Sequence, residues 1–212
     1  MNPSSSAMIR SLFISKGALE KGAVRPKEVP DQRAKKVGVL GAGMMGAGIA
    51  LVAAQAGMEV VLVDRSQDVA DKGKAYSEQY LNAGIKRGKV SDKIKDDILN
   101  RILATDDYTR LSKADLIIEA VFEDTKVKSD VTKAVLEIVR EDCIFASNTS
   151  TLPISELAKA SKYPENYIGI HFFSPVEKML LVEIIKGEKT GNRAVAKAVS
   201  YTHLTLPTRL MV

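Results

Sequence analysis

The sequence is poor in several residue types on which whole classes of protein depend. Its single cysteine, Cys143, can form no internal disulfide, which excludes a disulfide-stapled scaffold and suits a reducing compartment. The opening residues, MNPSSSAMIRSLFI, have no long apolar run and a single charge, Arg10, so they would make a poor signal or transit peptide. Aromatic residues make up 5% of the chain and none interrupts its densest basic group, which disfavours nucleic acid as a partner.

What the chain does contain is typical of a globular protein. Of its 212 residues, 45% are hydrophobic and 27% are charged, enough for one good core with at most a small appendage. The net charge is +5, and the basic residues are densest at Lys86, Arg87, Lys89, Lys93 and Lys95. That group is either the solvated face of a helix–loop–helix or a surface that attracts a polyanionic small substrate.

The most informative stretch is residues 36–64, KVGVLGAGMMGAGIALVAAQAGMEVVLVD. A strand pattern over residues 37–40 leads into a glycine-rich turn, a small-residue helix pattern that stops at Gly57, and a second strand that ends on Asp64. The turn consists of Gly41, Ala42, Gly43, Met44, Met45 and Gly46. The spacing GxGxxG alone is a weak motif, but between a strand and a helix, with an acid after the next strand, it predicts a dinucleotide site.

Each part of this motif has a physical task. Gly41 permits a tight turn, Gly43 lets the backbone approach a pyrophosphate, and Gly46 lets the helix lie close to the sheet. The free N–H groups and the positive dipole end of the helix favour the diphosphate. Asp64 can accept hydrogen bonds from the adenosine ribose and would repel a 2′-phosphate, so we expect NAD rather than NADP; Arg65 weakens that preference if it is more than a solvated loop residue.

The same stretch raises the alternative of a membrane span, because residues 37–58 carry no charge. Glycines and Gln55 interrupt this run, and its pattern changes from strand to helix at Gly41. A buried strand–helix–strand unit gives the same hydropathy, and we prefer that interpretation.

The rest of the chain alternates between strand and helix patterns. We expect a lead-in helix and linker over residues 1–35, one domain over 36–191, and a truncated, non-native tail over 192–212. Within the domain, helical patterns at 68–87 and from Ser91 through Ile94, Ile98 and Ile102 predict an inserted helical hairpin. Strand runs at 114–122, 143–146, 167–170 and 179–185, with a helix starting at Asp124 or Thr125, predict an α/β fold of the Rossmann type with a doubly wound, mostly parallel sheet.

Polar residues follow the strands of this predicted sheet. Asp64, Glu119 with Glu123, the turn 147–150, and His171 each lie at or just beyond the carboxyl end of a different strand. Ligands of open α/β sheets bind at that edge, so we expect one shared site there.

A second informative stretch is HFFSPVEKMLLVEII, residues 171–185. Glu183 lies inside an apolar strand pattern, where a carboxylate is costly unless it has a partner. If the chain folds back at Ser174-Pro175, that partner is His171, whose tautomer Glu183 would fix and whose imidazolium it would stabilise. Taken singly, His171 could be structural and Glu183 could pair with a lysine or face solvent. Beside a dinucleotide site, the pair suits the oxidation of an alcohol.

With these stretches in hand, the sequence resembles the NAD-binding domain of L-3-hydroxyacyl-CoA dehydrogenases, most closely the dehydrogenase segment of multifunctional fatty-acid β-oxidation enzymes. The motifs that carry the resemblance, within about residues 36–191, are VGVLGAGMMGAGIA, IIEAVFEDTKVK, CIFASNTSTLPISELA and HFFSPVEKMLLVEII. The resemblance implies NAD as cofactor, an acyl-CoA as substrate, and oxidation of a (3S)-3-hydroxyacyl-CoA to the 3-oxoacyl-CoA.

The resemblance also implies roles for individual residues. His171 would be the general base and Glu183 its orienting partner, while Asn148 and Ser150 would hold the substrate's 3-oxygen and the nicotinamide side of the site. The cofactor pocket would be lined by Glu119, Glu123 and Lys128, with Glu123 near the nicotinamide ribose. The plainer alternatives are that the turn SNTS is a helix N-cap and that Lys128 is a surface lysine. The basic group at 86–95 would meet the phosphates of coenzyme A.

Two departures from the family limit these expectations. Family members continue into a C-terminal helical domain that closes the cleft and mediates dimerisation, whereas this chain ends first, and residues 200–212 match no family continuation. We therefore expect a fragment with impaired activity and a doubtful dimer, from a bacterial cytoplasm or else a mitochondrial or peroxisomal matrix. A related hydroxyacid dehydrogenase and a non-catalytic NAD-binding module are the competing functions.

Overall fold

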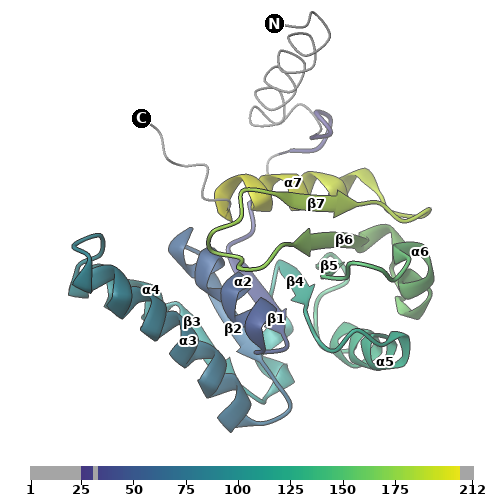
Figure 1. Cartoon of the computed structure of the whole chain (residues 1–212). Helices are drawn as coiled ribbons and strands as arrows, with labels where there is room; N and C mark the ends of the chain where they lie inside the picture. The colour runs from purple at the N-terminus through teal and green to yellow at the C-terminus, as the bar shows by residue number, and fades with distance from the viewer. Residues whose placement is uncertain (1–24, 31–32, 206–212) are drawn as a thin grey trace, which may run out of the picture.

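The fold is a mostly parallel sheet with helices on both faces, as the computed structural model of the chain shows (Figure 1). The structure describes residues 25–30 and 33–205. Within them one sheet contains seven strands in the order β3-β2-β1-β4-β5-β6-β7. All neighbouring strands are parallel except β6 and β7, which are antiparallel. The α/β fold class expected from the sequence is confirmed.

The strands are short and follow the apolar runs of the sequence. They are β1 (Lys36–Leu40), β2 (Glu59–Val63), β3 (Ile102–Thr105), β4 (Leu116–Glu119), β5 (Ile144–Ser147), β6 (Tyr167–Phe172) and β7 (Val182–Ile185). Alternate residues of one strand enter different cores: Val37 and Val39 lie in the core on one face of the sheet, and Leu40 lies in the core on the other. Because both faces are covered, these strands are apolar at nearly every position rather than at every second one.

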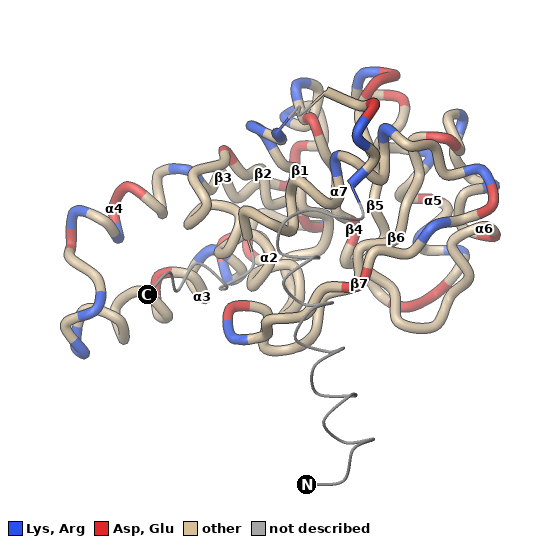
Figure 2. Tube along the Cα trace, turned by 90° about the horizontal axis from the view of Figure 1, so that it is seen from above, with Lys and Arg blue, Asp and Glu red and all other residues tan. Residues whose placement is uncertain are grey.

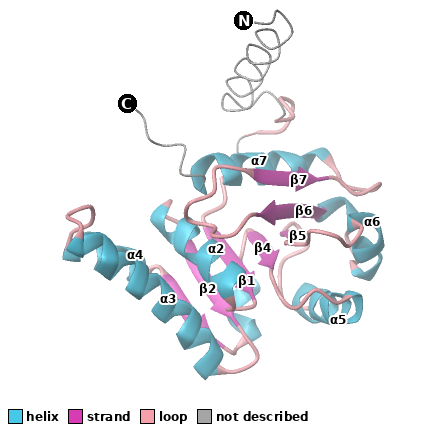
Figure 3. Ribbon diagram, in the orientation of Figure 1, coloured by secondary structure: helices cyan, strands magenta, loops and turns pink. Residues whose placement is uncertain are grey.

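Helices cover the sheet on both sides (Figure 3). The helices are α2 (Met44–Gln55), α3 (Gln67–Lys86), α4 (Asp92–Asn100), α5 (Thr125–Leu136), α6 (Ile154–Leu157) and α7 (Asn192–Thr205), with short 3-10 turns at Tyr108–Lys113, Ala158–Ala160 and Pro164–Asn166. The core of α2, α3, α4 and α7 contains Ile49, Leu81, Ile98 and Val199, and the core of α5 and α6 contains Val135 and Ile154. Burying each such side chain fully stabilises the fold by about 1.5–3 kcal/mol.

The predicted helical hairpin is present as α3 and α4. Ser91 caps α4 by accepting a hydrogen bond from Ile94 N at 3.3 Å, and Asp124 caps α5 in the same way from Val127 N at 2.9 Å. Seen from above, the hairpin extends away from the sheet, and basic segments lie toward its far end (Figure 2). The basic group of residues 86–95 is therefore far out on this arm.

Several boundaries expected from the sequence were wrong. Ile102 was assigned to the helical stripe of α4, but it begins β3, an edge strand that the sequence patterns did not reveal. The last strand was expected from residue 179, whereas β7 begins at Val182, and Leu180 and Leu181 are more than half exposed. Both residues lie in the loop that precedes β7, so their side chains have no sheet face to cover.

The division of the chain into segments stays a prediction. The expected lead-in helix and the end of the tail lie outside the described residues. Residues 192–205 form α7, whose Ala194, Ala198 and Tyr201 are fully buried. Over the described part of the chain, no helix is both long and apolar enough to cross a bilayer.

Candidate functional site

The glycine turn between β1 and α2 is built so that a side chain at two of its positions would collide with the backbone. Gly41 has a φ of +93°, which side chains disfavour, and a Cβ there would lie 2.6 Å from the Ala120 carbonyl oxygen. A Cβ at Gly46 would lie 1.7 Å from the carbonyl oxygen of Gly41. At Gly43 a Cβ would meet no atom within 4 Å. The fold itself therefore requires glycine at 41 and 46, while position 43 faces open space.

The first turn of α2 offers unpaired donors at this open side. Gly43 is the N-cap residue and, within the described part of the chain, no side chain caps the helix and no acidic residue lies in its first turn. The N–H groups of Met44 and Met45 thus have no intrahelical acceptor and carry the positive end of the helix dipole. Met44 is 70% exposed. The arrangement suits the diphosphate of a dinucleotide.

Asp64 lies beside the turn, as its place at the end of β2 predicts. One carboxylate oxygen accepts a hydrogen bond from Ala42 N at 2.6 Å and the other from Arg65 N at 2.7 Å. The carboxylate is thereby oriented at the carboxyl edge of the sheet, next to the glycine turn where the ribose of a dinucleotide would lie.

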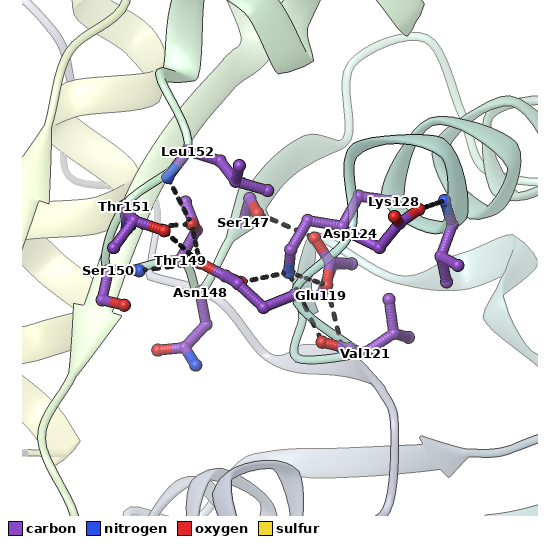
Figure 4. A network of polar contacts seen from close by, with 12 residues as sticks. Glu119, Val121, Asp124, Lys128, Ser147, Asn148, Thr149, Ser150, Thr151 and Leu152 are labelled. Carbon is purple, nitrogen blue, oxygen red and sulfur yellow. Dashed lines mark hydrogen bonds and ion pairs between the residues drawn. The ribbon is translucent and has the colours of Figure 1, made fainter.

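Glu119 and Lys128 form a buried ion pair at the end of β4 (Figure 4). Lys128 Nζ lies 2.7 Å from Glu119 Oε1, and both side chains are fully buried. Glu119 also accepts hydrogen bonds from Ser147 Oγ at 2.7 Å and from Val121 N at 2.8 Å. The alternative that Lys128 is a surface lysine is therefore wrong: α5 turns this side chain inward, where two carboxylates offset the cost of its burial.

The second carboxylate is Glu123, whose Oε2 lies 3.3 Å from Lys128 Nζ. Its Oε1 accepts hydrogen bonds from Thr149 Oγ1 and, at 3.3 Å, from Ser150 N. Burial would raise the pKa of Glu123, but the bond from Thr149 and the charge of Lys128 outweigh it and hold the pKa below its ordinary value. Glu123 therefore ties the start of α5 to the turn after β5.

The turn SNTS connects this network to β6. Asn148 Oδ1 accepts a hydrogen bond from Phe172 N at 2.9 Å, and Thr149 Oγ1 accepts one from Leu152 N at 3.0 Å. Ser150 is exposed. The alternative that SNTS is a helix N-cap is wrong, because α6 begins only at Ile154 with Pro153 as its N-cap residue.

The expected contact between His171 and Glu183 is present. The two residues are cross-strand partners in the antiparallel pair β6–β7, and His171 Nδ1 lies 2.8 Å from Glu183 Oε2. The His171 side chain is 16% exposed and that of Glu183 is 52% exposed. Because Nδ1 faces the carboxylate, the other ring nitrogen, Nε2, is the one left for a substrate.

The loop between β6 and β7 brings this pair to the glycine turn. Ser174 Oγ lies 3.8 Å from Met44 Sδ at the start of α2. Val176 lies against Gly48, where a Cβ would be 2.9 Å from the valine Cβ. The glycine turn, Asp64, the Glu119–Lys128 network, the SNTS turn and the His171–Glu183 pair thus share the carboxyl edge of the sheet; the roles of these residues stay predictions.

The sequence did not reveal the link between the hairpin and this loop. Tyr76, which looked like part of an apolar helix stripe, donates a hydrogen bond to Glu177 Oε1 at 2.9 Å. Burial and then the bond to Glu177 raise the pKa of Tyr76 to about 12. The hydroxyl group of a tyrosine within that apolar stripe is the signal that could have suggested this contact. Thr149 and Ser147 were likewise seen as part of a turn, not as partners of the two carboxylates.

Comparison with known proteins gives this edge a context. A family model described as "3-hydroxyacyl-CoA dehydrogenase, NAD binding domain" matches residues 36–205. The structure is similar to the (S)-3-hydroxybutyryl-CoA dehydrogenase of Ralstonia eutropha, with 38% identity and a TM-score of 0.77 over 82% of this chain and 62% of that one.

Two further solved structures are similar over most of this chain. The 3-hydroxybutyryl-CoA dehydrogenase of Escherichia coli K12 is 33% identical with a TM-score of 0.77, over 80% of this chain and 36% of that one. The dehydrogenase part of multifunctional enzyme 1 from C. elegans is 32% identical with a TM-score of 0.74, over 86% of this chain and 43% of that one. The chain thus spans 62% or less of the length of these three proteins.

Proposed function

We propose that this chain, which belongs to the 3-hydroxyacyl-CoA dehydrogenase family and contains its NAD-binding domain, serves the NAD-dependent oxidation of a (3S)-3-hydroxyacyl-CoA to the 3-oxoacyl-CoA in fatty-acid β-oxidation. The observation that carries the proposal is the His171–Glu183 contact of 2.8 Å at the same sheet edge as the glycine turn. A proton acceptor beside a hydride acceptor is what the oxidation of an alcohol requires.

His171 acts as the general base in this proposal. NAD, when bound beside the glycine turn, would supply the hydride acceptor for carbon 3 of the substrate. Nε2 of His171 removes the proton of the 3-hydroxyl group, and Nδ1–H stays hydrogen-bonded to Glu183. The carboxylate fixes the tautomer that leaves Nε2 unprotonated, and it stabilises the imidazolium once the proton has moved. Asn148 and Ser150, on the turn next to β6, orient the 3-oxygen.

The residues around the glycine turn fit the cofactor. Gly43 leaves room for the pyrophosphate, the N–H groups of Met44 and Met45 face it, and the oriented carboxylate of Asp64 accepts the ribose hydroxyls. Glu119, Glu123 and Lys128 line the pocket on the nicotinamide side, with Glu123 near the ribose. In this proposal the single positive charge of Lys128 offsets one of the two carboxylates, so that Glu119, Glu123 and Lys128 together carry one net negative charge.

The substrate's coenzyme A group is assigned to the α3–α4 arm. Lys86, Arg87, Lys89 and Lys93 are exposed there, while Lys95 lies 3.6 Å from Asp92. Exposed cations attract a polyanion at long range and cost nothing in desolvation until it arrives. The Tyr76–Glu177 hydrogen bond joins this arm to the loop between β6 and β7, the two strands that carry the catalytic pair.

The test is the oxidation of NADH with acetoacetyl-CoA. It is run on this chain alone and on this chain with the C-terminal domain of a relative added. His171→Gln should lower turnover by about 10²–10⁴, the usual contribution of a positioned general base, and leave NADH affinity unchanged. The matched control is His203→Gln, which removes the other histidine, on α7, and should leave turnover unchanged.

One result would contradict the assignment: a loss of NADH affinity in the His171 variant with turnover per bound cofactor unchanged. A non-catalytic NAD-binding module is the second candidate, and the 52% exposure of the Glu183 side chain favours it, because a solvated carboxylate orients a histidine less firmly. NADH binding without turnover, even with the added domain, would support that candidate.

A further inference from the structure

A cavity of about 490 Å³ lies at the edge of the sheet opposite to the proposed catalytic site. Lys35, Asp115 and Asp142 precede β1, β4 and β5, so the cavity opens at the amino ends of these parallel strands. Helix α7 closes it on one side with Arg193 and Lys197. Its volume is in the range of small-molecule sites. Its lining residues are Arg33, Lys35, Asp115, Arg140, Asp142, Arg193 and Lys197.

This amino-edge pocket has an excess of positive charge. Five of its seven lining residues are basic and two are acidic. Both acids already have partners. Asp142 Oδ1 lies 3.0 Å from Arg140 Nε, and its Oδ2 lies 3.3 Å from Arg193 Nη2.

Both carboxylate oxygens of Asp115 also have partners within the protein. Its Oδ2 accepts hydrogen bonds from the backbone N–H groups of Lys35 at 2.9 Å and Lys36 at 3.0 Å. Its Oδ1 lies 3.3 Å from Arg140 Nη2. The two acids therefore hold Arg140, Arg193 and the start of β1 in place, and neither forms an ion pair with Lys197.

Lys197 is the residue that points to a ligand. It is 8% exposed, yet across residues 25–30 and 33–205 its ammonium group has no hydrogen bond and no carboxylate within ion-pair distance. Burial lowers the pKa of Lys197 more than the attraction of Asp115 raises it. A cation on a mostly buried side chain without a partner is costly, and an anion in the pocket would reduce that cost.

We propose that the amino-edge pocket binds a phosphate-type oxyanion, held by the ammonium group of Lys197 and the guanidinium groups of Arg140 and Arg193. The basic side chains of the pocket favour an oxyanion such as phosphate, and a guanidinium group can donate two parallel hydrogen bonds to its oxygens. The anion is either inorganic phosphate or the phosphate group of a small molecule. The site lies at the other edge of the sheet from the glycine turn, so the proposal does not depend on the proposed dehydrogenase function.

The test is a titration of the full chain, saturated with NADH so that the cofactor site is filled. Inorganic phosphate and adenosine 3′,5′-bisphosphate are added in separate calorimetric titrations, and sodium chloride of equal ionic strength serves as the salt control. Saturable binding of phosphate is expected. Lys197→Met, which removes the ammonium group and keeps an unbranched side chain of similar size, should weaken it about tenfold or more, because one charge-assisted hydrogen bond is lost.

The matched control is Lys159→Met, which removes a lysine whose side chain is 71% exposed and lies outside the pocket. It should bind phosphate as the unmodified chain does. Circular dichroism and NADH affinity verify that both variants are folded. Tighter binding of the bisphosphate, lost in Lys197→Met, would identify a phosphorylated small molecule as the ligand; equal affinity would identify free phosphate. An effect of phosphate no larger than that of chloride, or unchanged binding in Lys197→Met, would overturn the proposal.

Discussion

Two lysines with buried side chains lie at opposite edges of the same sheet, and they differ in what surrounds their ammonium groups. Lys128 is fully buried, and its Nζ lies 2.7 Å from Glu119 and 3.3 Å from Glu123. Lys197 is almost as deeply buried, but no such partner exists for it in the part of the chain that the structure describes. Both charges cost desolvation energy, and only the charge of Lys128 is offset by partners within the fold.

The comparison separates two uses of a buried cation. At the carboxyl edge the lysine completes a network that is closed before any ligand arrives, and it fixes the geometry of two carboxylates. At the amino edge the lysine leaves the free protein with an unbalanced charge. Burial alone therefore does not distinguish a structural lysine from one that awaits a ligand; the presence or absence of a partner does.

The largest effect is expected when the paired lysine is removed. Lys128→Met leaves the buried Glu119 carboxylate without its counter-charge, and breaking such a pair costs about 3–5 kcal/mol of the free energy of unfolding. Urea denaturation monitored by circular dichroism measures it. Lys126→Met on the same helix is the control: its side chain is 83% exposed and pairs with Asp130 at 2.6 Å, a contact screened by solvent, so its loss should leave the free energy of unfolding almost unchanged.

The double variant Lys128→Met/Glu119→Gln sharpens this result. If the loss comes from an uncompensated buried charge, neutralising Glu119 as well should recover part of it. The losses in free energy of unfolding of the two single variants can be added and compared with the loss of the double variant. If the double variant loses more than this sum, packing rather than charge dominates at this position.

Removing the unpaired lysine should have a smaller effect of opposite sign. Lys197→Met takes away a charge that the fold does not compensate, so the free protein should become more stable by about 1 kcal/mol, a rise of about 2–4 °C in Tm. The folded pKa of Lys197 lies below its ordinary value of 10.5, so the unmodified chain bears the full penalty below that folded pKa and is relieved of it as the pH rises through it. Thermal unfolding at neutral and alkaline pH should show the advantage of the variant shrinking; destabilisation at neutral pH would mean that the fold does compensate this charge.

Much of this fold could be predicted because its signals are local. The glycine turn needs a φ of +93° at Gly41 and a close backbone approach at Gly46, and both requirements appear directly as glycines in the sequence. The contact between His171 and Glu183 followed from a single chain reversal between two strands. The wrong assignment of Ile102 to a helix also has a local cause. Ile102 continues the helical spacing of Ile94 and Ile98, although helix α4 has already ended at Asn100.

The remainder depended on contacts that no local pattern encodes. Lys128 lies in a mixed helical stretch, KVKSDV, and Lys197 in an apolar one, AVAKAV, and nothing in either stretch shows that Lys128 meets two carboxylates. Tyr76 and Glu177 are 101 positions apart, and their hydrogen bond exists only because α3 crosses the β6–β7 loop. Partners of this kind depend on tertiary packing, which the sequence patterns did not resolve.

The smallest expected effect concerns Glu123, the half-exposed member of the carboxyl-edge network. Its folded pKa lies below its ordinary value of 4.5, so its contribution to stability is present above pH 4.5 and is lost as the pH falls through the folded pKa. Because the side chain is 38% exposed and screened by solvent, the contribution should be on the order of 1 kcal/mol or less. The difference in urea midpoint between the unmodified chain and Glu123→Gln should therefore be positive at pH 7 and should shrink to zero as the pH falls below the folded pKa of Glu123. A difference that does not shrink at acidic pH would place the contribution in the hydrogen bonds with Thr149 and Ser150 rather than in the charge of Lys128, and the contrast between the two buried lysines would then rest on Glu119 alone.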